Sequence, residues 1–149
     1  MTAADLDRVL ENETRAYSYP WTRGNFEDCL RAGHECRVAC LNGEVIGHGI
    51  LSLGAGEAHI LNVCVRRDLQ GHGYGRALVE HMLARARKAG AELVFLEVRM
   101  SNLVAAGLYE TLGFNDIGTR RDYYPAASGH EDARVMALDL RTNFDGGQV

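Results

Sequence analysis

The stretch "QGHGYGRA", residues 70–77, places three glycines at alternate positions directly before a run with helical periodicity. Glycine has no Cβ, so backbone N–H groups here can approach a ligand closely, and the N-terminus of a helix favours an anion. A phosphate group is therefore the natural ligand of such a stretch. The alternative is a flexible start of a helix that binds nothing.

Two common phosphate-binding motifs do not match this stretch. A P-loop requires Lys and then Ser or Thr after its last glycine, whereas Arg76 and Ala77 stand here. A dinucleotide-binding fingerprint requires the spacing G-x-G-x-x-G, whereas Gly71, Gly73 and Gly75 alternate. The stretch therefore indicates a phosphate compound other than those that these two motifs bind.

The residues around the glycines predict one α/β domain. In chain order we expect helices at 2–17 and 22–32, antiparallel strands at 35–41, 44–53 and 57–65, a helix ending at Gly90, a strand at 91–98, a helix from Ser101 or Asn102 to Gly113, and strands at 114–120 and 133–140. Residues 121–132 are expected to form a loop. One mixed sheet with helices on both faces is the economical assembly, an α/β (α+β) fold. We expect this domain to span residues 1–140, with a frayed polar tail at 141–149.

The strand in "AELVFLEV" is expected at the centre of the sheet. Residues 93–98 are apolar on both faces apart from Glu97, so we expect both faces to be covered. A helical crossover precedes this strand, which predicts that it runs parallel to the strand before it. Glu97 lies near its C-terminal end, where sites in α/β sheets tend to open.

Composition and charge exclude several classes of protein. The chain has 149 residues, 46% hydrophobic and 24% charged, which is typical of one globular domain. The net charge of −4 argues against a nucleic-acid binder that relies on general basicity. The first 17 residues lack the apolar core of a signal peptide, and no run reaches the roughly 20 apolar residues of a membrane helix. We expect a cytoplasmic protein with no nucleic-acid or membrane partner; no feature indicates an oligomeric state.

The four cysteines, Cys29, Cys36, Cys40 and Cys64, lack the paired spacing of a disulfide framework. Reduced and mostly buried thiols are therefore expected. A zinc site from Cys29, His34, Cys36 and Cys40 would be the alternative, but the chain lacks the short CxxC pairs that usually anchor such a site. We expect no metal.

Several motifs together resemble the GCN5-related N-acetyltransferases, the GNAT family. The element Q-x-x-G-x-G (Gln70, Gly73, Gly75) follows "VCVRRDL" and is followed by "LEVRMSNLVAAGLYETLGF". The later stretch "RRDYYPAASGHEDARVMAL" is similar to the family members that acetylate the N-terminal alanine of a ribosomal protein. The resemblance covers roughly residues 3–140 and implies an enzyme with acetyl-CoA as co-substrate.

The resemblance also implies which residues bind acetyl-CoA. The diphosphate would lie on the glycine stretch, formed by Gly71, His72, Gly73, Tyr74, Gly75 and Arg76. Main-chain groups of Val63, Cys64 and Val65 would bind the pantetheine arm as an added strand does; the alternative is a plain core strand. Asn102 would contact the cofactor, and its alternative role is to cap a helix. The basic residue that is frequent in the family at the position of Gly71 is missing.

The resemblance assigns Glu97 as general base, acting through water, and Tyr109 as general acid. A terminal α-amine, with a pKa of about 7.7–8.0, is mostly protonated at pH 7, so a base helps. Proton transfer from a tyrosine to a thiolate is uphill by about 2 kcal/mol, so Tyr109 needs a lowered pKa or a desolvated thiolate. The alternatives are a Glu97 satisfied by Arg99 or solvent, and a Tyr109 that belongs to the core.

The stretch "RRDYYP", residues 120–125, suits one wall of an acceptor groove, with contacts from Tyr123 and Tyr124. Trp21 in "YPW" is expected on the opposite side, unless these rings only pack a loop. The resemblance implies that the acceptor is the N-terminal alanine of protein eighteen of the small ribosomal subunit. A small-molecule amine is the alternative acceptor, and a non-catalytic acyl-CoA-binding module is the alternative class.

Overall fold

A computed structural model of the chain describes residues 1–143, the last two by their backbone alone. The helices are η1 (Ala3–Asp5), α1 (Leu6–Ala16), α2 (Arg23–Arg31), η2 (Arg67–Leu69), α3 (Tyr74–Lys88), α4 (Leu103–Thr111) and α5 (Leu140–Asn143). The strands are β1 (Glu35–Leu41), β2 (Glu44–Gly54), β3 (Glu57–Val65), β4 (Leu93–Arg99), β5 (Asn115–Ala126) and β6 (Gly129–Asp139). Within the described residues no helix is both long and apolar enough to span a membrane.

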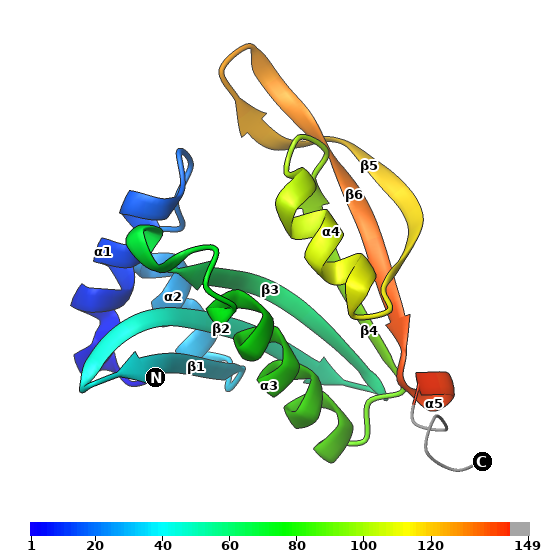
Figure 1. The fold of residues 1–149 in the computed structure, drawn as a ribbon, viewed down its shortest axis with the longest axis horizontal. Coiled ribbons are helices and arrows are strands. Elements are labelled where there is room, and N and C mark those ends of the chain that lie inside the picture. Colours follow the sequence, from blue (N-terminus) through cyan, green and yellow to red (C-terminus); the bar gives the residue numbers. More distant parts are fainter. Residues whose placement is uncertain (144–149) are drawn as a thin grey trace.

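The strands form one mixed sheet in the order β1-β2-β3-β4-β6-β5. β3 and β4 pair in parallel because α3 carries the chain back between them, whereas the other neighbours are antiparallel. Helices α1 and α2 lie on one face, and α3 and α4 lie on the other (Figure 1). The predicted fold class is confirmed.

Local signals in the sequence set several boundaries of these elements. Asn42 and Gly43 adopt φ of 53° and 83° and close the first hairpin as predicted. Thr22 caps α2, since its hydroxyl accepts a hydrogen bond from the N–H of Asn25 at 3.2 Å. Asn102 caps α4 by accepting from the N–H of Ala105 at 3.1 Å. These caps fix where the helices begin relative to the sheet.

β3 and β4 remain paired over only part of their lengths. Glu57–Ile60 pairs with Leu93–Leu96, and β3 is then bulged at Leu61 in its pairing with β2. Beyond this point β3 continues beside β2, while β4 continues beside β6. The two central strands therefore diverge, and the sheet opens at its middle (Figure 1).

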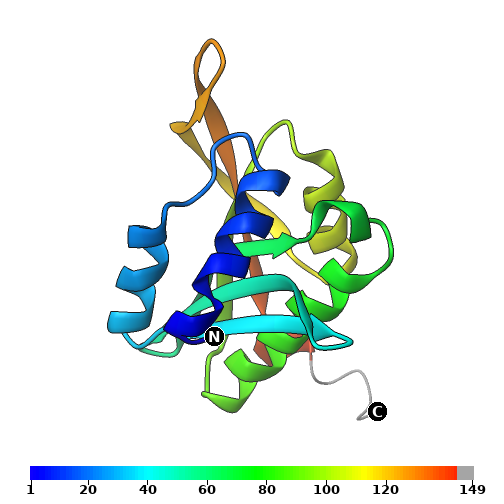
Figure 2. The same ribbon diagram turned by 90° about the vertical axis from the view of Figure 1, so that its left-hand side faces the viewer.

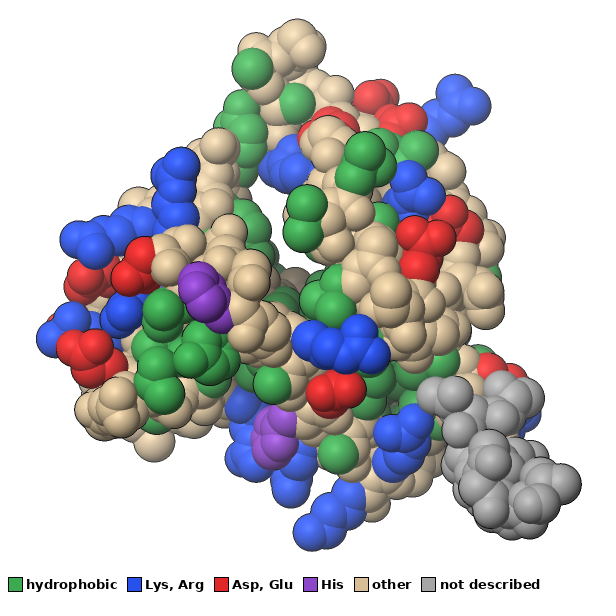
Figure 3. Space-filling model, viewed as in Figure 1, with side chains coloured by type: hydrophobic (Ala, Val, Ile, Leu, Met, Phe, Trp, Pro, Cys, Tyr) green, Lys and Arg blue, Asp and Glu red, His purple; other side chains and the backbone are tan. Residues whose placement is uncertain are grey.

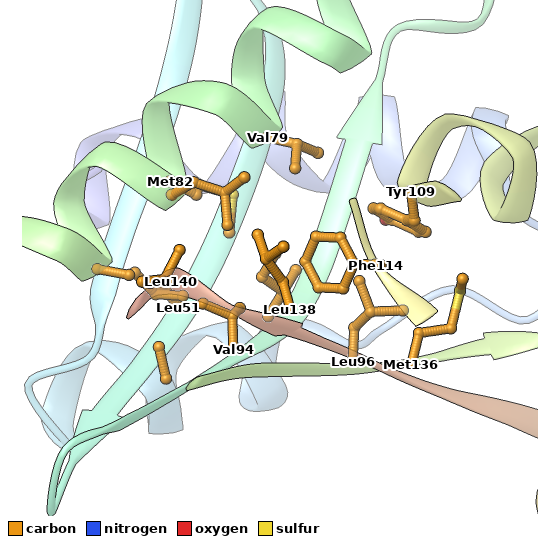
Figure 4. Packing of buried hydrophobic residues seen from close by; sticks show 14 of the residues in the cluster. Leu51, Val79, Met82, Val94, Leu96, Tyr109, Phe114, Met136, Leu138 and Leu140 are labelled. Atoms are coloured by element: carbon orange, nitrogen blue, oxygen red, sulfur yellow. The ribbon is translucent and has the colours of Figure 1, made fainter. Parts of the chain in front are cut away.

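Two hydrophobic cores lie on opposite faces of the sheet. The larger core fills the space between the sheet and helices α3 and α4. Figure 4 shows its central residues, Leu51, Val79, Met82, Val94, Leu96, Tyr109, Phe114, Met136, Leu138 and Leu140. The smaller core lies under α1 and α2 and is made of Leu6, Val9, Phe26, Cys29, Cys36 and Ile50.

The expectation that both faces of β4 are covered is wrong. Val94, Leu96 and Val98 are buried against α3 and α4, but Leu93 and Phe95 on the other face are only half-buried. Helices α1 and α2 pack against β1, β2 and β3, on the side of the molecule away from β4 in Figure 1. One face of β4 thus remains accessible near the opening of the sheet.

The expectation of a loop at residues 121–132 is also wrong. β5 and β6 continue as a two-stranded arm that projects beyond the rest of the domain (Figure 2). The pairing is irregular between Arg120 and Tyr124, where Asp122 has a φ of 51°. Because β5 is exposed along almost its whole length, its sequence lacks the alternation of apolar and polar residues that marks a strand.

Of the tail predicted to fray, residues 141–143 belong to α5 instead, and residues 144–149 lie outside the described residues. All four cysteines are free thiols, and three are buried while Cys40 is exposed. The alternative zinc ligands, Cys29, His34, Cys36 and Cys40, do not come together anywhere in residues 1–143.

Candidate active site

The glycine stretch forms the start of α3. Gly71 and Gly73 have φ of 81° and 87°, a left-handed backbone that glycine adopts without strain. Gly73 is the N-cap of α3 and supplies no capping side chain, so the first N–H groups of the helix can serve a ligand. A Cβ on Gly71 or Gly73 would meet nothing within 4 Å, so the space above both residues is open.

Side chains of the same stretch already make contacts. The Nδ1 atom of His72 lies 3.0 Å from the carbonyl oxygen of Gln70. The guanidinium of Arg76 donates to the Thr111 hydroxyl on α4 at 2.9 Å and lies 3.5 Å from the Glu80 carboxylate. Arg76 therefore lies at the start of α3 with part of its guanidinium already engaged by Thr111 and Glu80.

The open edge of β3 exposes main-chain groups of alternate residues. The carbonyl of Val63 accepts a hydrogen bond from the Tyr17 hydroxyl, and the carbonyl of Val65 accepts one from the Gln70 amide at 3.1 Å. Since successive residues of a strand point their main-chain groups to opposite sides, Val63 and Val65 face the opening and Cys64 faces β2. Burial also raises the pKa of the Cys64 thiol. Two of the three predicted pantetheine-binding residues are therefore suitably turned, and Cys64 is not.

Glu97 and Tyr109 lie on opposite faces of the sheet. Tyr109 belongs to the core under α3 and α4, where its ring packs 5.6 Å from that of Phe114. Glu97 alternates with the buried residues of β4 and so points to the other face, with its side chain only 8% exposed. The two can act on one ligand only through the opening between β3 and β4, which is visible as a gap in the molecular surface (Figure 3).

Two partners hold the carboxylate of Glu97. The Nε2 atom of His59 on β3 lies 2.7 Å from Oε1, and the Nε atom of Arg120 on β5 lies 3.5 Å from Oε2. Arg99, the partner considered from the sequence, instead pairs with Glu131 at 3.1 Å. The sequence did not indicate His59, because its proximity to Glu97 depends on the register of two strands that are far apart in the chain.

The condition of a lowered pKa for Tyr109 is not met. Burial raises the pKa of Tyr109 to about 12. Protonation of a thiolate with an ordinary pKa by such a tyrosine is uphill by about 5 kcal/mol. A role as general acid therefore requires the other condition, a thiolate that is itself enclosed and desolvated.

An arginine between two tyrosines lies beside Glu97. The Arg99 guanidinium lies 5.2 Å from the ring centre of Tyr19 and 4.6 Å from that of Tyr124, which are cation–π distances. Burial, followed by the nearby charges of Tyr123 and Glu97, raises the pKa of Tyr124. This stack joins the α1–α2 connection to the β5–β6 arm across the open face of β4.

The other predicted acceptor contacts are placed differently. Tyr123 is 47% exposed, and its ring packs edge-on at 4.9 Å from that of Tyr124. Trp21 packs its ring 5.2 Å from Phe26, against the smaller core. In the "YPW" stretch it is therefore Tyr19, which the sequence did not single out, that reaches Tyr124 through Arg99.

A buried polar network anchors the α1–α2 connection. Glu13 is 2% exposed; its Oε1 lies 2.9 Å from Nε2 of the fully buried His48, and its Oε2 accepts from the N–H of Trp21 at 3.0 Å. Asn62 on β3 also donates to this carboxylate, at 3.3 Å. Glu13, His48 and Cys64 are the group of potential metal ligands found in residues 1–143. Because these protein donors already bind the carboxylate, the network has a structural role that links α1 to β2 and β3.

A hollow of about 1090 Å³ lies elsewhere, between α1, the β1–β2 hairpin and η2. Arginines and carboxylates of both charges line it, among them Arg15, Arg66, Glu11 and Glu44. None of the predicted site residues borders this hollow. The opening between β3 and β4 is the candidate site, because the β3 edge, with the glycine stretch that follows it, and Glu97 border it.

Comparisons with known proteins identify the family of the chain. A family model described as the acetyltransferase (GNAT) family matches residues 6–114. A curated relative from Escherichia coli K12, [ribosomal protein bS18]-alanine N-acetyltransferase, is 37% identical over 94% of this chain and 95% of its own. The crystal structure of the E. coli ribosomal-protein-S18-alanine N-acetyltransferase superposes with a TM-score of 0.88, at 37% identity over 94% of this chain and 90% of that one. A Bacillus subtilis acetyltransferase in complex with CoA has the same fold, with a TM-score of 0.76 at 23% identity over 94% of each chain.

Proposed function

Because the chain belongs to the acetyltransferase (GNAT) family, as the sequence predicted, we propose that it acetylates the α-amine of an N-terminal alanine with acetyl-CoA as the acetyl donor. The expected acceptor is ribosomal protein bS18, the acceptor named for its relatives. The observation that carries the proposal is the opening between β3 and β4. Glu97 borders it on one face and Tyr109 on the other, so a thioester and an amine can meet there from opposite sides.

Acetyl-CoA binds along the β3 edge in this proposal. The diphosphate lies on the N–H groups of residues 71–76, where the helix N-terminus stabilises its charge. The pantetheine arm follows the main-chain groups of Val63 and Val65 as an added strand would. The Tyr17 hydroxyl, now bonded to the Val63 carbonyl, must then move or be shared with the cofactor. Asn102, whose side chain caps α4, is the further residue that contacts the cofactor in this proposal.

The chemistry follows from the two residues that border the opening. Glu97 takes a proton from the α-ammonium through water, and the free amine attacks the thioester carbonyl carbon. A C–N bond forms, the C–S bond breaks, and the thiolate leaves toward the face that carries Tyr109. Tyr109 protonates it, which the raised pKa of Tyr109 permits only if the bound cofactor encloses the sulfur. As the C–N bond forms, the nitrogen loses a second proton, which restores the hydroxyl of Tyr109, and the proton held by Glu97 is released to solvent.

The accessible face of β4 supports a peptide acceptor over an enclosed small amine. Leu93 and Phe95 on that face are only half-buried, and Arg99 on the same strand lies between Tyr19 and Tyr124 from two separate segments. In this proposal a peptide lies along the accessible face of β4 beside the Tyr19–Arg99–Tyr124 stack, which joins the two segments, while its amine reaches Glu97.

The test combines purified protein, acetyl-CoA and a peptide with the N-terminal sequence of bS18. We expect thiol release together with a mass gain of one acetyl group at the peptide α-amine. The same peptide with a blocked N-terminus is the control, and a polyamine tests the small-molecule alternative. Absence of thiol release with any Ala-starting peptide, while calorimetry detects acetyl-CoA binding, would remove the proposed acceptor.

A further inference from the structure

We infer that His59 is a positioning residue that orients the catalytic carboxylate of Glu97, an inference that rests on the proposed role of Glu97 as the base. His59 lies on β3, two residues before the bulge, in register with Phe95 of β4. This is one of the last positions at which the two strands are still paired. The backbone of His59 is therefore fixed relative to β4 at the point where the sheet begins to open.

The contact distinguishes the two oxygens of Glu97. Oε1 lies 2.7 Å from Nε2 of His59, and because a carboxylate only accepts hydrogen bonds, Nε2 is the donor. Oε2 lies 3.5 Å from Arg120, whose side chain is 57% exposed. A pair of this length with a mostly exposed guanidinium is easily exchanged, whereas the short bond to His59 holds the carboxylate in one orientation.

Because His59 binds Oε1, Oε2 is the oxygen of Glu97 that takes the proton. The N–H bond of the α-ammonium breaks, the proton passes through one water to Oε2, and His59 retains its own proton on Nε2. The carboxyl group later returns the proton to solvent. Without the bond from His59 the carboxylate can rotate, and the fraction of time in which Oε2 faces the amine falls.

The competing explanation is that His59 only ties β3 to β4. A purely structural bond would lower stability or weaken acetyl-CoA binding, because the β3 edge forms the cofactor site, and would leave kcat unchanged. The ring is 34% exposed and borders a shallow hollow of about 180 Å³ next to Ser52 and Phe95, so substitutions can be made there without disturbing either core.

The test compares His59→Leu, which removes the donor, with His59→Gln, whose amide N–H reaches the position of Nε2. With an Ala-starting peptide we expect His59→Leu to lower kcat about 10- to 100-fold with an unchanged KM for acetyl-CoA. His59→Gln should recover most of that loss. If His59→Leu fails to fold, His59→Asn replaces it, because its shorter amide does not reach Oε1.

A double-mutant cycle with Glu97→Gln shows whether His59 acts through Glu97. When Glu97→Gln is already present, the loss of His59 should change kcat less than about 2-fold, because no carboxylate remains to be oriented. An equal loss of kcat in both backgrounds, or a wild-type kcat in His59→Leu, overturns the inference. Failure of the proposed function looks different: wild-type protein then acetylates no Ala-starting peptide. A wild-type rate in Glu97→Gln overturns both the role of Glu97 as base and the role of His59 in positioning it.

Discussion

The two edges of the central opening are built in different ways. The β3 edge, defined as Val63, Val65 and the glycine stretch 71–76, offers main-chain groups and a helix N-terminus. The β4 edge, defined as Glu97 and Arg99 with the side chains that contact them (His59, Arg120, Tyr19 and Tyr124), offers charged and aromatic side chains from several segments. A bound cofactor common to many reactions needs only backbone geometry, whereas an acceptor and its proton need particular side chains.

This difference has a consequence for mutations. Most substitutions on the β3 edge leave its main-chain groups in place, so only glycines with left-handed backbones are sensitive there. On the β4 edge each side chain has its own partner, and single substitutions remove single functions. Changes on the β3 edge should therefore alter cofactor binding, and changes on the β4 edge should alter turnover or acceptor binding.

The largest effect is expected from Glu97→Gln. The substitution keeps the size of the side chain and removes its ability to take a proton, so kcat with an Ala-starting peptide should fall about 10²- to 10⁴-fold. The Kd for acetyl-CoA should stay at the wild-type value, because the β3 edge is untouched. A thiol-release assay and calorimetry measure the two quantities.

Glu110→Gln is the matched control, since Glu110 is an exposed residue of α4. Equal rates for wild type and Glu97→Gln would show that Glu97 is not a base and that the site works by positioning alone.

A smaller loss is expected from Tyr109→Phe, which keeps the ring packed against Phe114. A tyrosine with a pKa of about 12 is a weak acid, so kcat should fall at the lower end of the usual range, about 10²-fold. The raised pKa also keeps the hydroxyl protonated up to a pH of about 10, so its ionisation should cause no loss of kcat between about pH 8 and 10. If kcat of the wild-type protein falls between about pH 8 and 10 and kcat of Tyr109→Phe does not, the pKa of Tyr109 is not raised and this prediction is contradicted.

The β3 edge could be predicted largely from the sequence, because its signals are local. Alternate glycines after a strand and before a helix place Gly71 and Gly73 at the start of α3 without knowledge of any distant contact. Resemblance to a family then supplied the kind of ligand. The exception is Cys64, whose orientation depends on the pairing of β3 with β2.

The β4 edge could be predicted only in part. Glu97 and Tyr109 were found by resemblance, but the contact of His59 with Glu97 depends on strand register, and the contact of Tyr19 with Arg99 depends on the path of the α1–α2 connection. The β5–β6 arm was mistaken for a loop, because a strand exposed on both faces has no hydrophobic period. Sequence patterns report burial well and report contacts between distant exposed segments poorly.

On the β3 edge, Gly73→Ala should weaken acetyl-CoA binding. A Cβ at a φ of 87° is strained by about 1–2 kcal/mol, and relief of that strain moves the N–H groups that bind the diphosphate. We expect the Kd for acetyl-CoA to rise about 5- to 30-fold, with kcat at saturating cofactor near the wild-type value.

Gly54→Ala is the matched control for this prediction, because a Cβ there meets nothing within 4 Å and the backbone is not left-handed. If Gly73→Ala binds acetyl-CoA as tightly as the control does, the diphosphate does not lie on this stretch.

The smallest effect is expected from Arg99→Met, which removes the cation between Tyr19 and Tyr124. A cation–π contact is worth about 0.5–1 kcal/mol, so loss of one contact between the two walls should raise the KM for the peptide about 2- to 5-fold; the substitution also removes the Arg99–Glu131 ion pair. Arg99→Lys keeps the charge but not the planar stack, so its KM for the peptide should lie between those of the wild type and Arg99→Met. Arg87→Met, on the exposed face of α3, is the control. Should Arg99→Met instead weaken acetyl-CoA binding and leave the KM for the peptide unchanged, the two edges do not divide the work as proposed, since a side chain of the β4 edge would then serve the cofactor.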